Sequence, residues 1–113
     1  MTSPLETGIQ IVVDLLIRGE YGTIEALTRG RRLSSDALEQ AVRAYGRSLV
    51  DPPPNWLQKL DVVGVDSASS PTYSVVVPLW TKEEGLSDLS LELTMVEFAP
   101  GLFETIVDDL RVR

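Results

Sequence analysis

The chain has 113 residues, of which 43% are hydrophobic and 24% charged, a composition typical of one folded domain. It contains neither cysteine nor histidine, which excludes disulfides, thiolate zinc sites and the common nucleophilic triads. Acids and bases balance in residues 1–50, so the whole net charge of -7 lies in residues 51–113, and we expect so acidic a chain to repel nucleic-acid phosphates.

Apolar spacing in residues 5–47 predicts three helices. The first ends at Arg18-Gly19, and its apolar run is too short and too polar to span a membrane. The second, Tyr21–Thr28, is expected to begin at an N-cap formed by Thr23 and to point Ile24 and Leu27 inward. Ser34 is expected to cap the third helix, whose inner face holds Leu38, Ala41, Val42 and Tyr45.

Residues 51–55, Asp-Pro-Pro-Pro-Asn, separate these helices from the rest of the chain. Consecutive prolines forbid helix and ladder pairing, so the segment is predicted to be a stiff connector. A ligand for a proline-recognising domain is the functional alternative. Trp56, which follows, is expected to cover one end of the core.

A period of two from Leu60 onward predicts strands, and the short turns between them require antiparallel neighbours. The strands are Leu60–Asp66, Thr72–Thr81, Asp88–Phe98 and Leu102–Val112. In the third strand, Leu89, Leu91 and Leu93 share one face and are expected to face the helices. The apolar phase of the fourth strand changes midway, and a β-bulge at Asp108-Asp109 would restore a single apolar face.

These elements predict a two-layer α+β domain over residues 1–113. A helical layer (5–47) packs on a curved four-stranded antiparallel meander (60–113), and the connector (51–55) joins them.

The second strand is apolar on both faces, whereas an antiparallel strand with one wet face should alternate. Val76, Pro78 and Trp80 form the row opposite Val75, Val77 and Leu79. A curled sheet that wraps the core would explain this row, and so would a pocket wall or a subunit interface anchored by Trp80. Because Pro78 lacks a ladder donor, it marks an edge position or a bulge.

Carboxylates are the remaining candidates for chemistry. Glu92 lies opposite the leucines, where it faces water on an open sheet or becomes an acid or base if that face is covered. The pair Asp108-Asp109 can share a divalent ion only if a bulge turns both side chains to one face, and we predict no metal site and no cofactor. The candidate acidic surface for a basic partner comprises Glu83, Glu84, Asp88, Asp108 and Asp109.

Several segments together resemble a family of short bacterial proteins described only as a domain of unknown function. They are Gly30-Arg31-Arg32-Leu33-Ser34, Ala41-Val42-x-x-Tyr45-Gly46, Pro52-Pro53-Pro54, Ser74–Thr81 and Glu83-Glu84-Gly85-x-Ser87-Asp88-Leu89. This resemblance implies no activity. The order of elements is also similar to the nuclear transport factor two-like (cystatin-like) cone, in which a curved sheet wraps a helix. Catalytic members of that superfamily commonly use a histidine or a tyrosine–aspartate pair. This chain has no histidine.

The function that we expect first is a non-catalytic, cytoplasmic binding or accessory module that acts through its acidic sheet half. A homodimer paired through the sheet and an immunity- or inhibitor-like role against a basic partner are forms of this hypothesis. The alternative is a cone-shaped protein that binds a small ligand, with or without weak catalysis, in a pocket lined by Tyr73, Trp80 and Glu92. We expect no nucleic-acid or membrane partner.

Overall fold

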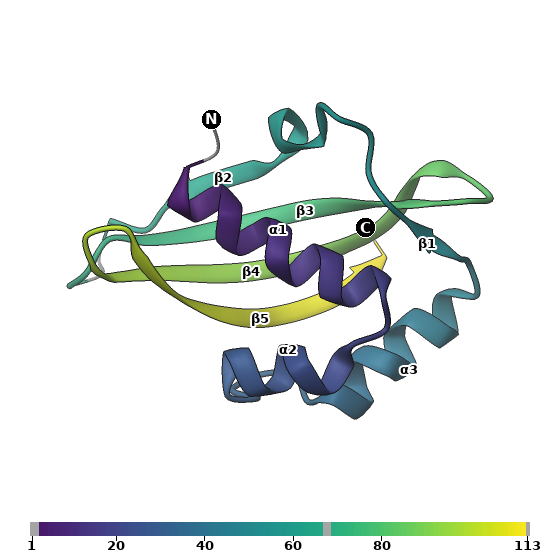
Figure 1. Cartoon of the computed structure of the whole chain (residues 1–113), viewed down its shortest axis with the longest axis horizontal. Coiled ribbons are helices and arrows are strands. Elements are labelled where there is room, and N and C mark those ends of the chain that lie inside the picture. The colour runs from purple at the N-terminus through teal and green to yellow at the C-terminus, as the bar shows by residue number, and fades with distance from the viewer. Residues whose placement is uncertain (1–2, 67–68, 113) are drawn as a thin grey trace.

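The computed structural model, which describes residues 3–66 and 69–112, has three helices followed by an antiparallel sheet, as predicted. Figure 1 shows α1 lying across one face of the sheet, with α2 and α3 beside the β5 edge. The elements are α1 (Pro4–Ile17), α2 (Tyr21–Thr28), α3 (Ser35–Tyr45), β1 (Leu49–Val50), the 3₁₀ turn η1 (Trp56–Lys59), β2 (Asp61–Gly64), β3 (Thr72–Thr81), β4 (Gly85–Ala99) and β5 (Leu102–Val112).

The helix ends follow local capping chemistry. Ser3 caps α1 in a reciprocal capping box with Glu6, a signal that was present in the sequence but not used above. Ser34 caps α3 as predicted, and its Oγ accepts a hydrogen bond from the Ala37 backbone N–H at 3.2 Å. Gly46 ends α3 in the left-handed conformation with φ 71°.

Two expectations for α2 are wrong. Its N-cap is Glu20, and Thr23 lies inside the helix, where its hydroxyl donates a hydrogen bond to the Glu20 carboxylate. Ile24 is buried, but Leu27 is 55% exposed, because only one narrow side of this two-turn helix faces the core. A helix of eight residues offers too few positions for periodicity to separate its two sides.

The sheet has the order β1-β3-β4-β5, with β2 also paired to β3, and it does not close into a barrel. The strand β1, a two-residue element before the prolines, was not predicted. It pairs with Trp80 and Thr81, whereas β2 pairs with residues 73–76. Pro78 lies in the gap between these short strands, where its missing N–H costs no hydrogen bond on that side, and the β3–β4 register shifts next to it.

The predicted bulge in β5 is confirmed. Leu93 pairs with Val107 and Glu92 with Asp109, so Asp108 is the extra residue. The shift brings Val107 and Leu110 to the same buried face, with exposures of 2% and 5%. Without it, the alternation of β5 would send Leu110 to the opposite face.

The core lies between α1 and the sheet. Leu89, Leu91 and Leu93 turn towards the helices, as predicted, and are at most 2% exposed. Trp56 is 8% exposed and belongs to this core. The other buried apolar side chains come from α1, α2, α3, β3, β4 and β5: Ile9, Val12, Val13, Leu16, Ile24, Leu38, Val75, Val77, Leu79, Met95, Val107 and Leu110.

Candidate functional site

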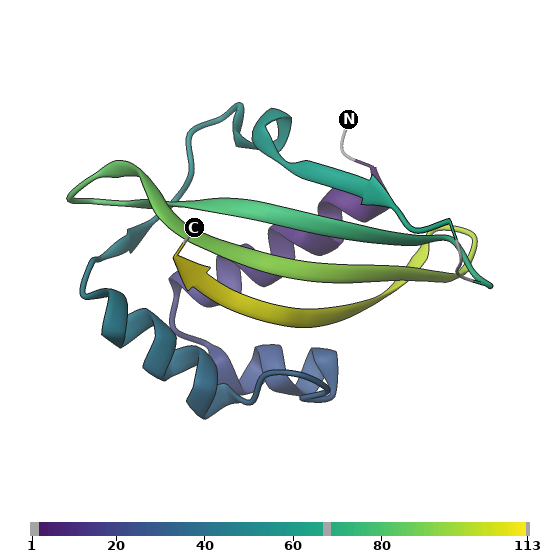
Figure 2. The ribbon, with the colours of Figure 1, turned by 180° about the vertical axis from the view of Figure 1, so that it is seen from behind.

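The second face of the sheet is the candidate site. Seen from behind in Figure 2, the long strands β3, β4 and β5 have no helix in front of them. Alternation sends Val75 and Val77 under α1 and places Val76 and Pro78 on this uncovered side, where they are half-buried by their neighbours on the sheet. We call this surface the open face; its central residues are Val76, Pro78, Ser90, Glu92, Thr94, Val96, Ile106, Asp109 and Arg111.

Three of the five residues predicted to form a pocket or interface share the open face: Val76, Pro78 and Glu92. Trp80 follows the register shift in β3, and its side chain packs against the core. Tyr73 does not share the open face either, because its odd position in β3 turns it to the helix side. There its ring lies 6.3 Å from that of Phe103, with an interplanar angle of 52°. Tyr73 and Glu92 therefore lie on opposite sides of the sheet and do not line one cavity.

The space between α1 and the sheet is filled by side chains. Val75, Leu91, Leu93 and Met95 have no exposed surface. Gly8 of α1 approaches the end of the Met95 side chain so closely that a Cβ atom would lie 2.9 Å from Met95 Cε. Close packing of this kind leaves no interior pocket at this position for a ligand.

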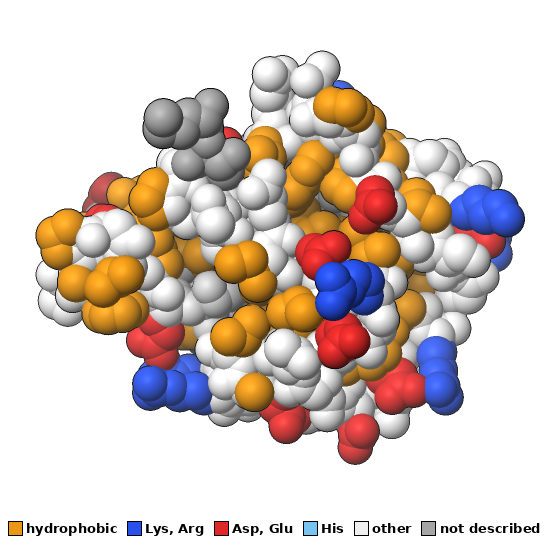
Figure 3. All heavy atoms as spheres, in the orientation of Figure 1, with side chains coloured by type: hydrophobic (Ala, Val, Ile, Leu, Met, Phe, Trp, Pro, Cys, Tyr) orange, Lys and Arg blue, Asp and Glu red, His pale blue; other side chains and the backbone are white. Residues whose placement is uncertain are grey.

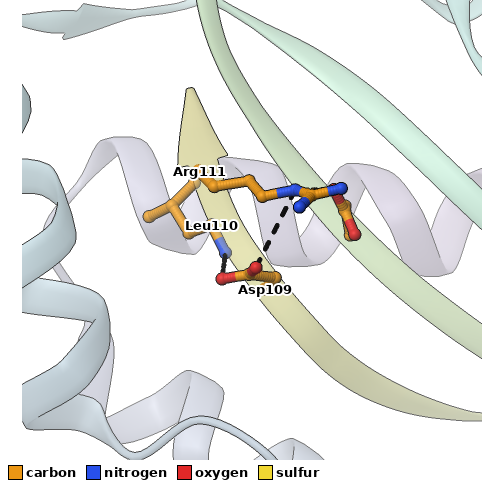
Figure 4. Close-up of polar contacts among 4 residues, drawn as sticks. Asp109, Leu110 and Arg111 are labelled. Carbon is orange, nitrogen blue, oxygen red and sulfur yellow. Dashed lines mark hydrogen bonds and ion pairs between the residues drawn. The ribbon is translucent and has the colours of Figure 1, made fainter. Parts of the chain in front are cut away.

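An ion pair occupies the middle of the open face. Arg111 Nε lies 2.6 Å from Glu92 Oε2 and 3.9 Å from Asp109 Oδ2. Figure 4 shows Asp109 and Arg111 side by side on β5, with the Asp109 carboxylate also accepting the Leu110 backbone N–H at 2.8 Å. The guanidinium thus neutralises part of the acidic charge on this surface.

The bulge turns Asp108 towards partners of its own. Its Oδ2 accepts a hydrogen bond from the Thr94 hydroxyl at 2.6 Å, and its Oδ1 lies 3.1 Å from Arg32 Nε. Arg31 pairs in the same way with Glu104 of β5. The arginines after α2 therefore cover the edge of the sheet, which limits edge-to-edge pairing with other chains.

Glu83 and Glu84, at the β3–β4 hairpin, are tied to other elements. The Ser48 backbone N–H donates to Glu83 Oε1 at 2.8 Å, and this bond is the main reason that the pKa of Glu83 is lowered. The Tyr45 hydroxyl donates to Glu84 Oε1 at 2.7 Å, and this bond is the main reason that the pKa of Tyr45 is raised. These carboxylates hold the hairpin to β1 and α3.

The five predicted acids thus fall into two groups. Asp88 belongs with the hairpin, since its backbone N–H donates to the Tyr45 hydroxyl at 3.3 Å. Asp108 and Asp109 belong to the bulge. Across residues 3–66 and 69–112, no three carboxylates are arranged so that they could hold a metal ion.

Sequence reasoning missed part of the open face. Thr94, Val96 and Ile106 lie beside Val76 and Glu92 only because of the pairing register between β3, β4 and β5. Strict alternation in the third predicted strand marked the polar members, and the predicted meander gave the neighbouring strands, but nothing in the sequence indicated the register in which those strands would pair.

A family model described as a domain of unknown function (DUF7668) matches residues 13–113. The chain belongs to this family. No curated protein and no solved structure matches it significantly. The DUF7668 match thus covers α2, α3, the whole sheet and residues 13–17 at the end of α1, and it leaves the function to be argued from the site. Among the described helices of this DUF7668 chain, none has the length and apolar character required to cross a bilayer.

Proposed function

We propose that the chain is a non-catalytic protein-binding module that docks through the open face onto a partner with apolar and basic side chains. The single observation behind this proposal is that half-buried aliphatic side chains lie among polar ones on a sheet face that no described element covers. Val76 and Pro78 contribute from β3, Val96 from β4 and Ile106 from β5. Apolar contacts at the centre of a patch supply most of the free energy in protein interfaces.

The size of the open face suits a protein partner. Three long strands spaced about 4.8 Å apart, each contributing about ten residues of about 3.3 Å, cover roughly 480 Å² in projection. Typical specific interfaces bury about 800 Å² per partner, and side-chain relief makes the accessible area larger than the projection. A small ligand would contact only a fraction of this flat surface.

Charge favours a basic partner over a second copy of the chain. Asp61, Asp88, Glu92 and Asp109 lie on or around the open face, against Arg111 as the basic side chain within it. Face-to-face docking of two copies would bring these acids together, whereas lysine or arginine on a partner would pair with them. An inhibitor or immunity protein that covers a basic protein, in the cytoplasm, is one role that such a surface can serve.

A defined peptide pair tests the proposal. A ten-residue peptide of alternating arginine and valine is titrated into ¹⁵N-labelled protein, with an alternating glutamate–valine peptide as the matched probe. We expect amide shifts at Val76, Thr94 and Ile106 with the basic peptide only, and at least tenfold weaker binding to Val76→Lys. Leu27 lies on the helical side of the molecule, where its side chain is 55% exposed, and the equivalent change Leu27→Lys should leave binding unchanged.

Three outcomes would contradict the proposal. Shifts confined to the helix side would place binding elsewhere, and equal binding of the acidic peptide would remove the role of charge. A dimer in sedimentation equilibrium that Val76→Lys dissociates would identify the occupant of the open face as a second copy of the chain.

A further inference from the structure

A hollow on the helix side of the sheet has no role in the open face. It lies between the C-terminal half of α1 and the connector, and it measures about 250 Å³. Its lining residues are Gln10, Val13, Asp14, Ile17, Asp51, Pro52 and Trp56. In Figure 3, acidic side chains border an apolar area over this part of α1. The hollow therefore combines an apolar floor with a polar, negatively charged rim.

Two carboxylates, Asp14 and Asp51, border this hollow. Asp14 lies in the last turn of α1, where the helix dipole already places partial negative charge. Arg18 compensates for it from one side, with Nη1 3.2 Å from the carboxylate, and both side chains are more than half exposed. Asp51, across the hollow, has no hydrogen bond or ion pair within the described part of the chain. Asp14, Asp51 and the C-terminal end of α1 thus place negative charge at the hollow, and Arg18 pairs with Asp14.

The floor of the hollow suits the rest of an organic cation. Trp56 is 8% exposed and Val13 2%, so a fixed indole and a fixed aliphatic side chain form part of the wall. Cations bind favourably near the faces of tryptophan rings, and a short alkyl stem gains from contact with apolar walls. The Gln10 amide adds a neutral hydrogen-bond acceptor to the rim.

We propose that this hollow binds a guanidinium or ammonium group carried on a short apolar stem. Asp51 and Asp14 hold the charged head, and Trp56, Val13 and Pro52 contact the stem. At about 250 Å³, the hollow has room for a charged head and a short alkyl stem. The chemistry is the same for a free amine and for an arginine or lysine side chain of another protein.

The test uses n-butylguanidinium as the probe and butyrate, of opposite charge, as its matched control. Titration is followed by ¹H–¹⁵N spectra, in which the Trp56 indole N–H reports on the hollow and the Thr94 backbone N–H on the open face. We expect saturable shifts at Gln10, Asp14 and Trp56 in the millimolar range, at least fivefold weaker binding to Asp51→Asn, and no effect of butyrate. Asp66→Asn, which removes an exposed acid elsewhere, should bind as the parent does.

Unchanged binding to Asp51→Asn, or equal shifts of the Thr94 amide, would overturn the proposal. If Asp51→Asn perturbs the fold in thermal unfolding, Asp51→Glu keeps the charge and should keep binding. N-acetyl-arginine-amide separates the two sources of the ligand: binding equal to that of butylguanidinium assigns a protein side chain, and weaker binding assigns a free amine. Because the hollow and the open face lie on different sides of the sheet, Val76→Lys should leave this binding intact.

Discussion

The two faces of the sheet are built from the same three long strands but differ in how deeply their side chains are buried. On the helix side, Val75, Leu91 and Leu93 have no exposed surface. On the open face, their immediate neighbours Val76 and Glu92 are half-buried, and an arginine pairs with the glutamate. The difference teaches that alternation alone assigns a side chain to a face, while the packing of α1 decides which face becomes core.

The strongest way to break this comparison is to insert one alanine between Asp109 and Leu110. The insertion should send Leu110 to the open face and Arg111 towards the core, at a cost of about 4 kcal/mol or more in the free energy of unfolding. Asp108→Ala keeps the residue count and loses only the contacts to Thr94 and Arg32, so it should cost about 1 kcal/mol. Urea denaturation measures both. Equal stability of the two variants would mean that β5 shifts its register without penalty.

A pair of truncations compares the two faces directly. Leu91→Ala should lower the free energy of unfolding by about 2–5 kcal/mol, because its side chain is completely buried against α1. Val76→Ala should cost less than about 1 kcal/mol, since no described element packs on it from outside. Chemical denaturation of both variants is the measurement. Similar losses would show that the open face is as tightly packed as the core.

A smaller effect concerns the hairpin that joins β3 and β4. The folded-state pKa of Glu83 lies below its ordinary value of 4.5, so the stabilisation from this group is present above that value and is lost as pH falls through the lowered folded-state pKa. Glu83→Gln should therefore flatten the decrease in unfolding free energy below pH 4.5. Ser48→Ala should flatten it less, because the backbone N–H is the main donor. An identical pH dependence of the parent and Glu83→Gln would contradict this assignment.

Much of the fold follows from local signals. The bounds of α2, β3 and β5 agree with the predicted segments, because each begins and ends at a turn residue or a change in apolar period. The bulge at Asp108 was visible as a change of apolar phase. By contrast, β1 has only two residues, and its strand conformation depends on pairing with Trp80 and Thr81, far along the chain.

The candidate site was predicted in part for the same reason. Val76, Pro78, Trp80 and Glu92 were assigned to one face by parity along their own strands, but Tyr73 was grouped with them against that parity. The anchoring of Glu83 by Ser48 and of Glu84 by Tyr45 joins residues more than thirty positions apart, which no local pattern indicates. Nothing in the sequence indicated the hollow beside α1, because it forms only where the connector meets the helix.

The sequence by itself determined the order of elements, the alternation of each strand and the excess of acid in the second half, because these depend on neighbours within a few residues. Only the tertiary structure decided which side of the sheet α1 covers, which carboxylates find arginine or hydroxyl partners, and where an uncovered face and a hollow remain. Those outcomes depend on contacts between distant segments, and such contacts form when the chain buries its largest apolar surface.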